Sequence, residues 1–294
     1  MPLEQAQVQT WLDEFHDAMS APVDFNRLKP LMSKRVTVDM PGEAKMKKFE
    51  DWEKKQKDYL TAFKGAKRTM PKGSPVIVVA AKKDEVDVIC PHLVSFKWTK
   101  ELGEKYLNVN LSSGDNSKLM MYDRIKLSSK SECGQYAPLF SPIDFKQADR
   151  QDDDDTWGHK FVKALSEGGE ALTKMLADDM VAAVGAGKMN KDQWVEHEGK
   201  HTEVKYSLIS KLPPVIGQSD KDGIAEAIVP LERTFKWNDA LKESYPGAEF
   251  TAGSLVRMVS YEQMKVKEGK VLMVSPHMDP ATCIKAAGGK SGAN

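Results

Sequence analysis

Apolar residues recur every three or four positions in several stretches of the chain, which is the spacing of an amphipathic helix. Residues 4–20 show this spacing around Phe15, and residues 43–63 show it around Trp52. A shorter stretch of the same kind lies at 24–32. The pattern therefore predicts three helices in the first quarter of the chain.

Strict alternation of apolar and polar residues, which is typical of β-strands, appears between and after these helices. The segment "KRVTVDMPG" (34–42) alternates and stops at Pro-Gly, which predicts a strand and a turn. Four longer β segments follow, at 74–81, 85–98, 117–128 and 135–143. The order is helix, helix, strand, helix and then an antiparallel meander, which predicts an α+β fold with the helices packed on one face of a curved sheet.

The second half of the chain repeats this order. Helices are predicted at 157–167 and 170–177, a strand at 179–185, a helix at 190–203, and strands after that.

One phrase occurs twice, as "SFKWTKELGEKY" (95–106) and as "TFKWNDALKESY" (234–245). At the same offset of 139 positions, 15 of the 53 residues from Pro75 to Leu127 are identical to their counterparts, without a gap. Such a register indicates a duplicated domain of about 140 residues, not a solenoid, whose repeats are 20–50 residues long.

The domain boundary is predicted at an acidic segment. We expect a first domain at 1–146, a linker at 147–156, a second domain at 157–283 and a disordered tail at 284–294. The linker contains four consecutive aspartates, which repel one another and resist burial. A calcium-binding loop is the alternative, but the spaced ligands and the glycine of an EF-hand are missing.

Composition narrows the class of protein. Lysine plus arginine and aspartate plus glutamate both number 43, so no basic excess suggests a nucleic-acid partner. Three scattered cysteines predict free thiols in a reducing compartment, not a disulfide framework. The first residues do not resemble a signal peptide, and no apolar run is long enough for a membrane span. We expect a soluble, cytoplasmic protein that has no membrane partner.

The order of elements resembles the nuclear transport factor 2-like superfamily, with its SnoaL-like and ketosteroid-isomerase-like branches the most similar. The segment "LMSKRVTVDMPG" (31–42) leads into a helix in the same way, and "SYEQMKVKEGKVLMVSPHMD" (260–279) is similar to the final hairpin, with Gly269 at its turn. The resemblance implies a cone in each copy, formed by a bent sheet around about three helices with a pocket at its open end. It implies no cofactor.

A tandem pair in a family that often dimerises implies an internal pseudo-dimer, monomeric as a chain, with higher assembly left open. Trp98 and Trp237 would then lie near symmetric positions, and Phe96 and Trp98 would join the two copies through the sheet surface.

Two acids are the candidate catalytic residues. Family enzymes carry a base just before the proline of the first strand, but that position is Met40 here, and Asp39 is expected to point outward. The second copy, "MVAAVGAG" (180–187), has no acid there. The acid of the penultimate strand is matched by Asp123 and Glu262. Alternation turns both inward among apolar residues, where burial would raise the pKa of each carboxyl.

A structural role for these acids, bonded to backbone or to a helix, is the alternative. Pocket-lining side chains implied by the resemblance come from both copies: Phe15, Met40, Trp52, Tyr106, Phe161, Trp194, Tyr245 and His277. Tyr106 and Tyr245 end short loop or helix segments that could cover the pocket. His277, near the pocket mouth, could assist proton transfer or could simply be packed.

The segment "HEGKH" (197–201) formally matches the H-E-x-x-H zinc motif. Gly199 and Lys200 lie inside it, and no third ligand is evident, so we expect a solvated helix face and no metal. Histidines 16, 92 and 159 are scattered in the sequence, and Cys90 is expected to be a small core residue.

Three functions remain open. The first is the binding of a small, largely apolar ligand in the cones. The second is a cofactor-independent isomerase, cyclase or epoxide-opening enzyme with Asp123 or Glu262 as the acid. The third is a scaffold that holds a partner chain on its sheet face or long loops.

Overall fold

A computed structural model describes residues 3–40, 43–82, 84–106, 109–140, 146–147, 156–184, 187–209, 212–217, 219–242, 245, 250–278 and 284–285. The chain forms two compact units. Unit 1 comprises Met1–Asp152 with Val215–Gln218, and unit 2 comprises Asp153–Pro214 with Ser219–Asn294. The division falls inside the acidic segment that the sequence marks.

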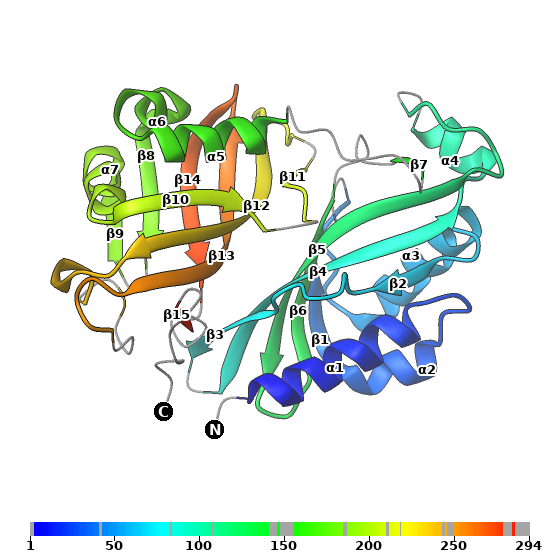
Figure 1. The fold of residues 1–294 in the computed structure, drawn as a ribbon. Coiled ribbons are helices and arrows are strands. Elements are labelled where there is room, and N and C mark those ends of the chain that lie inside the picture. Colours follow the sequence, from blue (N-terminus) through cyan, green and yellow to red (C-terminus); the bar gives the residue numbers. More distant parts are fainter. Residues whose placement is uncertain are drawn as a thin grey trace. The chain divides into compact units, whose positions relative to one another are not determined.

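Unit 1 begins with α1, α2 and the 3-10 helix η1, followed by β1, α3 and a meander (Figure 1). Its helices are α1 (Gln5–Ala18), α2 (Phe25–Leu28), η1 (Lys29–Leu31), α3 (Phe49–Ala62) and α4 (Lys100–Lys105). Its strands are β1 (Met32–Val38), β2 (Lys67–Thr69), β3 (Ile77–Lys82), β4 (Glu85–Lys97), β5 (Asn116–Ser128), β6 (Cys133–Leu139) and β7 (Lys146–Gln147), and β11 (Val215–Ile216) falls within the segment grouped with this unit.

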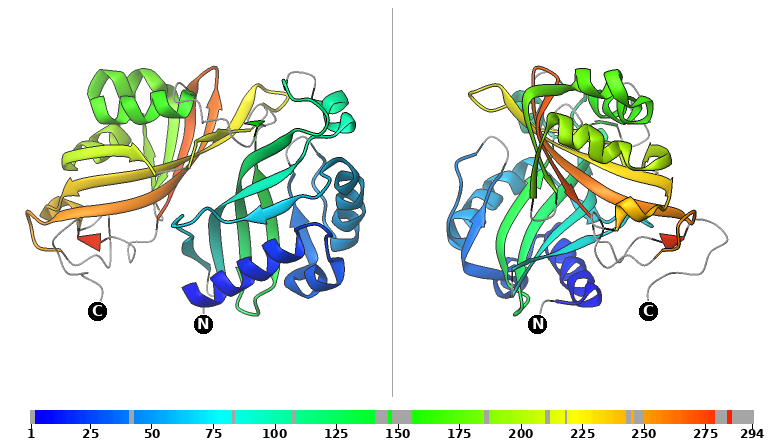
Figure 2. Two further views of the ribbon diagram at one scale, coloured as in Figure 1. Left: turned by 45° about the vertical axis from the view of Figure 1, so that its right-hand side comes forward. Right: turned by 90° about the vertical axis from the view of Figure 1, so that its left-hand side faces the viewer.

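The sheet of unit 1 has the strand order β1-β6-β5-β4-β2, with β3 paired to β4 and β7 paired to β5. Strand β1 runs parallel to β6, while β4, β5 and β6 form an antiparallel meander. Helices α1 and α3 lie on one side of this curved sheet (Figures 1 and 2). Apolar side chains of both helices and of the sheet form one core, which contains Phe15 and Trp52. The predicted α+β cone is confirmed.

Unit 2 repeats the arrangement. Its helices are α5 (Trp157–Glu167), α6 (Gly169–Met175), α7 (Lys191–Gly199) and η3 (Asp239–Leu241). Its strands are β8 (Leu176–Val184), β9 (Gly187–Asn190), β10 (Thr202–Leu208), β12 (Ile224–Lys236), β13 (Leu255–Lys267), β14 (Lys270–His277) and β15 (Ile284–Lys285).

The strand order of unit 2, β8-β14-β13-β12-β10, matches that of unit 1 strand for strand, and β9 extends it beside β8. The repeated Phe-Lys-Trp phrase makes the same backbone bonds in both units. The N–H of Gly114 donates to the carbonyl of Trp98 at 2.8 Å, and the N–H of Gly253 donates to that of Trp237 at 2.8 Å. Both glycines have positive φ, a conformation that favours glycine. The duplication is therefore a structural one.

The aromatic residues of the repeated phrase pack inside their own units. Phe96 and Trp98 are buried with Leu102 in a cluster of unit 1, and Trp237 is buried with Phe235 in a cluster of unit 2. The expectation that Phe96 and Trp98 join the two copies is corrected, because β4 turns them to the same face as His92 and Val94. The internal pseudo-dimer stays a prediction.

Two boundaries differ from the sequence prediction. The helix expected at 190–203 ends at Gly199, and β10 begins at Thr202. The expected tail is wrong for Ile284 and Lys285, whose backbones pair with β13. Residues 286–294 and the "SPID" segment (141–144) lie outside the described residues.

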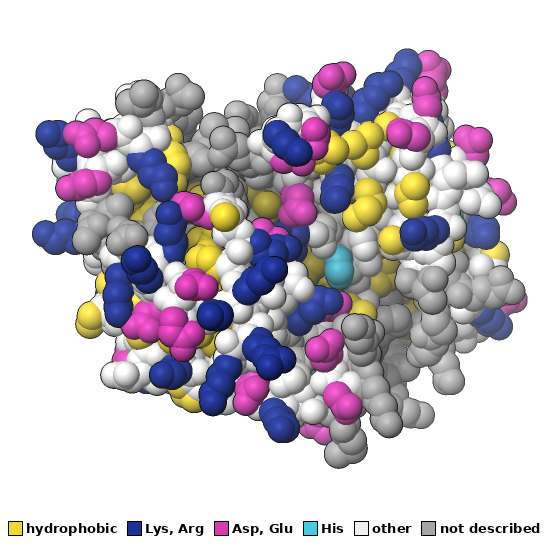
Figure 3. All heavy atoms as spheres, turned by 180° about the vertical axis from the view of Figure 1, so that it is seen from behind, with side chains coloured by type: hydrophobic (Ala, Val, Ile, Leu, Met, Phe, Trp, Pro, Cys, Tyr) yellow, Lys and Arg dark blue, Asp and Glu magenta, His cyan; other side chains and the backbone are white. Residues whose placement is uncertain are grey.

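None of the described helices has both the length and the apolar character needed to cross a membrane. On the face seen in Figure 3, lysine and arginine side chains are interspersed with aspartate and glutamate, in keeping with the balanced composition.

Candidate functional site

The inward face of the sheet in unit 1 carries a cluster of polar side chains. Asp123 on β5 lies opposite Cys90 on β4, and His92 lies opposite Met121. Because side chains alternate along a strand, Asp123 and His92 both project to the core side. Helix α1 covers this side and contributes His16. The predicted inward orientation of Asp123 is confirmed, and its side chain is fully buried.

The carboxylate of Asp123 lies between two imidazoles. Oδ2 is 3.1 Å from Nε2 of His16 in a buried hydrogen bond. Nδ1 of His92 lies 2.8 Å from the same oxygen, a close ion-pair distance without good hydrogen-bond geometry. The two rings are neighbours, with centroids 4.9 Å apart. Residues separated by more than 100 positions thus form one polar cluster.

Arg68 determines which nitrogen of His92 carries the proton. Nη1 of Arg68 lies 2.8 Å from Nε2 of His92. A guanidinium only donates, so Nε2 of His92 must accept, and the proton of the neutral ring is on Nδ1, facing Asp123. His92 therefore connects the cation of Arg68 to the anion of Asp123.

The pKa values follow from these contacts. Burial lowers the pKa of His92 to about 4, although the charge of Asp123 opposes this shift. For Asp123, burial alone would raise the pKa, but the nearby His92 and the hydrogen-bonded His16 together outweigh it, so the pKa lies well below its usual range. The sequence-based expectation of a raised pKa for Asp123 is wrong, because histidine partners cannot be read from strand alternation.

A cavity opens next to this cluster, with an empty volume of about 580 Å³ that includes space open to solvent. Nine of its eleven lining side chains are apolar, and among them are Met19, Met40 and Met121. The two polar lining side chains are Gln56 from α3 and Arg68 from β2. Pockets of this apolar character with a few polar groups are typical of sites for small molecules.

The same cluster offers three metal-ligating groups, since atoms of His16, His92 and Asp123 lie within 4.8 Å of one another. Arg68 disfavours a metal there. If Nδ1 of His92 bound a cation, Nε2 would carry the ring proton and face an arginine donor. Histidine ligands instead usually donate that second N–H to an acceptor.

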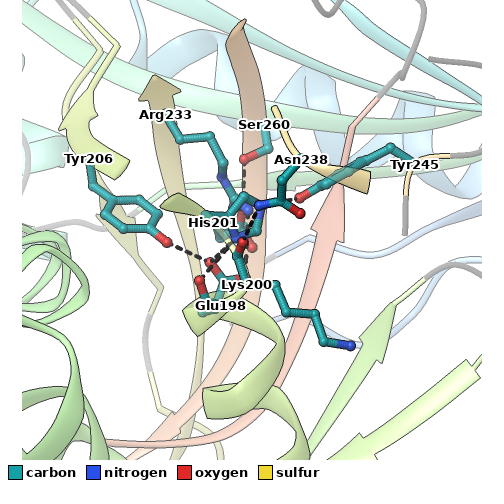
Figure 4. A network of polar contacts seen from close by, with 9 residues as sticks. Glu198, Lys200, His201, Tyr206, Arg233, Asn238, Tyr245 and Ser260 are labelled. Atoms are coloured by element: carbon teal, nitrogen blue, oxygen red, sulfur yellow. Dashed lines mark hydrogen bonds and ion pairs between the residues drawn. The ribbon is translucent and has the colours of Figure 1, made fainter. Parts of the chain in front are cut away.

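Unit 2 has a different buried polar network, which includes Arg233, Ser260 and Glu198 (Figure 4). Its acid, Glu262, belongs to this network. Oε1 of Glu262 accepts from Nη2 of Arg233 at 2.7 Å and from the hydroxyl of Ser260 at 2.6 Å. Burial raises the pKa of Glu262, while Arg233 opposes this shift. The predicted inward orientation and raised pKa of Glu262 are therefore confirmed.

A second carboxylate completes this network. Oε1 of Glu198 lies 3.5 Å from Nη1 of Arg233, and Oε2 accepts from the hydroxyl of Tyr206 at 2.8 Å. Burial works against ionisation of Glu198, but Arg233, His201 and the hydrogen bond from Tyr206 together outweigh it, and the pKa of Glu198 is lowered. The arginine of unit 2 is thus held between two carboxylates.

The H-E-x-x-H segment is a buried part of this network. His197, Glu198 and His201 are all buried, so the expectation of a solvated helix face is wrong. Nδ1 of His201 donates to the carbonyl of Glu198 at 3.0 Å, and Nε2 accepts from the hydroxyl of Tyr245 at 2.7 Å. Both nitrogens of His201 are therefore occupied by protein groups, which leaves neither for zinc.

Of the residues predicted to line the pockets, some line the cavity of unit 1 and others are packed in the cores. Met40 lines the cavity of unit 1, whereas Phe15 and Trp52 belong to the packed core behind it. Tyr106 is half-buried against the cluster around Trp98. Asp39 is partly exposed and pairs with Lys45 at 2.9 Å, which agrees with an outward orientation.

In unit 2, Phe161 and Trp194 are buried in the core. The hydroxyl of Tyr245 bonds to His201, as described above. His277 is half-buried, and its Nε2 lies 3.1 Å from Oε1 of Gln263.

Sequence reasoning missed His16, His92, Gln56 and Arg68. Pairing of β2 with β4 and the docking of α1 bring them together, and neither contact has a signature in the sequence. One signal was available: His92 and Cys90 share the inward face of β4 with the apolar residues that alternate along it.

No protein-family model and no curated protein matches the chain. Solved structures to which it is similar include a hexachlorocyclohexane dehydrochlorinase (LinA, type 2), at 9% identity with a TM-score of 0.39, covering 51% of this chain and 92% of that one. An NTF2-like protein of unknown function from Exiguobacterium sp. 255-15 has 15% identity and a TM-score of 0.33, with 46% and 98% covered. Protein Kfla4162 from Kribbella flavida has 10% identity and a TM-score of 0.37, with 47% and 90% covered.

Each of these similarities spans about half of the chain. The chain is a tandem of two α+β cones, each with a buried acid on the middle strand of its antiparallel meander, Asp123 on β5 and Glu262 on β13.

Proposed function

We propose that unit 1 binds one small, largely apolar molecule in the cavity beside Arg68. The observation that carries this proposal is the lining of the cavity, with nine apolar side chains and two polar ones, Gln56 and Arg68. Burial of an apolar ligand against such a surface is favourable by roughly 25 cal/mol for each Å² removed from water. The polar pair would orient the molecule.

Unit 2 is proposed to have a structural acid instead. Glu262 is held by Arg233 and Ser260, and Arg233 is held by Glu198. Because the cation of Arg233 is paired with carboxylates of its own unit, it needs no ligand to pair its charge.

Native mass spectrometry of the purified full chain, followed by denaturing extraction, tests the proposal. We expect one small molecule per chain. Ala66, which lines the cavity, provides a blocking variant: A66F should fill the space and release the molecule. A6F, with the same added bulk at an exposed position of α1, is the matched control and should retain it. If neither the wild-type protein nor the A66F variant carries an apolar molecule, the proposal is refuted.

A second candidate is an enzyme, and the His92–Asp123 pair favours it. Nε2 of His92 is the unprotonated nitrogen, and it faces Arg68, which lines the cavity. If Arg68 turned to a bound ligand, Nε2 could remove a proton from that ligand while Asp123 stabilised the imidazolium. Recovery of a chemically altered molecule from wild-type protein, but an unaltered one from H92Q, would distinguish catalysis from carriage.

A further inference from the structure

The cation that lines the cavity of unit 1, Arg68, has no acidic partner in the part of the chain that the structure describes. Among the described residues, the guanidinium of Arg68 makes one hydrogen bond, from Nη1 to the neutral ring of His92. Its Nε is buried without a hydrogen-bond partner, as is Nε of Arg233 in unit 2. The difference is that Arg233 pairs with two carboxylates, whereas no described carboxylate forms an ion pair with Arg68. Asp123 lies on the far side of the His92 ring. Charged groups next to an apolar space are costly unless they are paired, so this site is incomplete.

The other polar lining residue, Gln56, also has an amide that is free to contact a ligand. The side chain of Gln56 is buried, with 6% of its surface exposed. Its amide makes no hydrogen bond to the described residues and lines the cavity. An amide can donate to an oxygen of a ligand as well as accept from one. The two groups together offer donors to an acceptor inside the cavity.

The second copy of the domain shows how the same place is completed from within. Trp52 on α3 corresponds to Trp194 on α7, and the residue one turn later is Gln56 in unit 1 and Glu198 in unit 2. Both are buried to the same degree, at 6% exposed. In unit 2 this helix therefore provides a carboxylate, whereas in unit 1 it provides a neutral amide.

The cation occurs in both copies, on neighbouring strands. Arg68 on β2 pairs with Val94 on β4, while in unit 2 the corresponding pair is Tyr206 on β10 with Arg233 on β12. In unit 2, Arg233 faces Glu198 at 3.5 Å. Unit 1 thus keeps the cation of this pair but has lost the carboxylate, and it has a cavity at that place.

From these observations we propose that the ligand of unit 1 is an apolar monocarboxylic acid. Its carboxylate would pair with Arg68 and accept a hydrogen bond from Gln56, in the role that Glu198 has in unit 2, and its hydrocarbon part would lie against the methionines of the cavity. This proposal rests on the proposed function of unit 1 as a binding site, and it specifies the ligand class.

Isothermal titration calorimetry with octanoic acid and octan-1-ol at pH 8 tests it, because the two probes differ in charge and have the same chain length. Wild-type protein should bind octanoate at least about tenfold more tightly than octanol, as expected for a charge-assisted hydrogen bond in an apolar site. R68M should lose this preference and keep its affinity for octanol within about twofold. Q56E places in unit 1 the carboxylate that Glu198 provides in unit 2. It should therefore weaken the binding of octanoate by a similar factor of about ten.

K67M is the matched control, since Lys67 is an exposed cation on the same strand and its loss changes the net charge equally. It should leave both affinities unchanged. Equal binding of acid and alcohol, or a preference that survives R68M, would overturn the acid proposal while leaving the binding function intact. Binding of neither probe would overturn both.

Discussion

At the scale of single residues, the two copies place an acid at the same strand position and give it opposite properties. Asp123 is held ionised between histidines, while burial raises the pKa of Glu262 beside Arg233. The family resemblance pointed to both acids, and strand alternation predicted that they face inward. Their partners could not be predicted, because His16, Arg68 and Glu198 come from other elements that approach only in the folded chain.

The pKa of His92 makes unit 1 sensitive to acid. The folded-state value is about 4, against 6.5 for an ordinary histidine. Between these pH values the unfolded chain binds a proton that the folded chain excludes, so stability is full above pH 6.5 and falls as the pH drops towards 4. The loss from this residue is at most about 3 kcal/mol.

NMR titration of ¹⁵N-labelled histidine in the full chain measures this directly. His92 should be neutral with its proton on Nδ1 at pH 7, and its midpoint should lie near pH 4. H92Q assigns the signal. A midpoint near 6.5, or a proton on Nε2, is incompatible with the contact to Arg68.

At the scale of elements, most helices and long strands could be predicted from periodicity alone. The helix predicted at 157–167 has the bounds of α5, and the strand predicted at 85–98 differs from β4 by one residue. The short strand β2 was not predicted, because three residues carry too little alternation to be recognised. Its absence from the prediction is also why Arg68 was missed.

Close packing of α5 provides a test of the fold of unit 2. A Cβ added at Gly158 would lie 2.3 Å from Cβ of Pro214 and 2.4 Å from its Cγ. The proline ring cannot rotate away, so G158A should destabilise unit 2 by about 1–3 kcal/mol.

Gly103 in α4 is the matched helical glycine, because an added Cβ would meet only Nε1 of Trp98, at an ordinary 3.6 Å. G103A should leave stability unchanged or raise it by up to about 1 kcal/mol. Chemical denaturation of both variants measures these effects. Equal effects of the two substitutions would show that Gly158 is not packed against Pro214 as described.

At the scale of the whole molecule, duplication has been followed by divergence of the two interiors. Both units have the same strand order, and the repeated Phe-Lys-Trp phrase makes the same backbone hydrogen bonds in each. The polar groups inside have changed: unit 2 satisfies its arginine with its own carboxylates, and unit 1 leaves its arginine facing a cavity. Comparison of the two halves of the sequence showed the duplication. The different placement of the two arginines, and the replacement of Glu198 by Gln56, could be recognised only once the strand pairing was known.

The two arginines should therefore differ in their contribution to stability. R233M removes the cation between Glu198 and Glu262, and burying these acids without it should cost unit 2 about 3–5 kcal/mol. R68M removes one hydrogen bond to His92 and breaks no ion pair with any described residue, so it should cost about 1 kcal/mol. Urea unfolding of both variants measures the difference. A larger loss for R68M would contradict the assignment of a structural role to unit 2 and a ligand site to unit 1.

The most direct test of the central claim is a methyl NMR titration of the full chain, labelled with ¹³C at the methionine methyl groups, with octanoate. Met19, Met40 and Met121 line the cavity of unit 1. Met32 in the core of the same unit and Met258 and Met264 in unit 2 are internal controls. We predict saturable shifts of the three cavity methyls and none of the controls. Unchanged cavity methyls, or shifts of equal size in unit 2, would contradict a ligand site in unit 1.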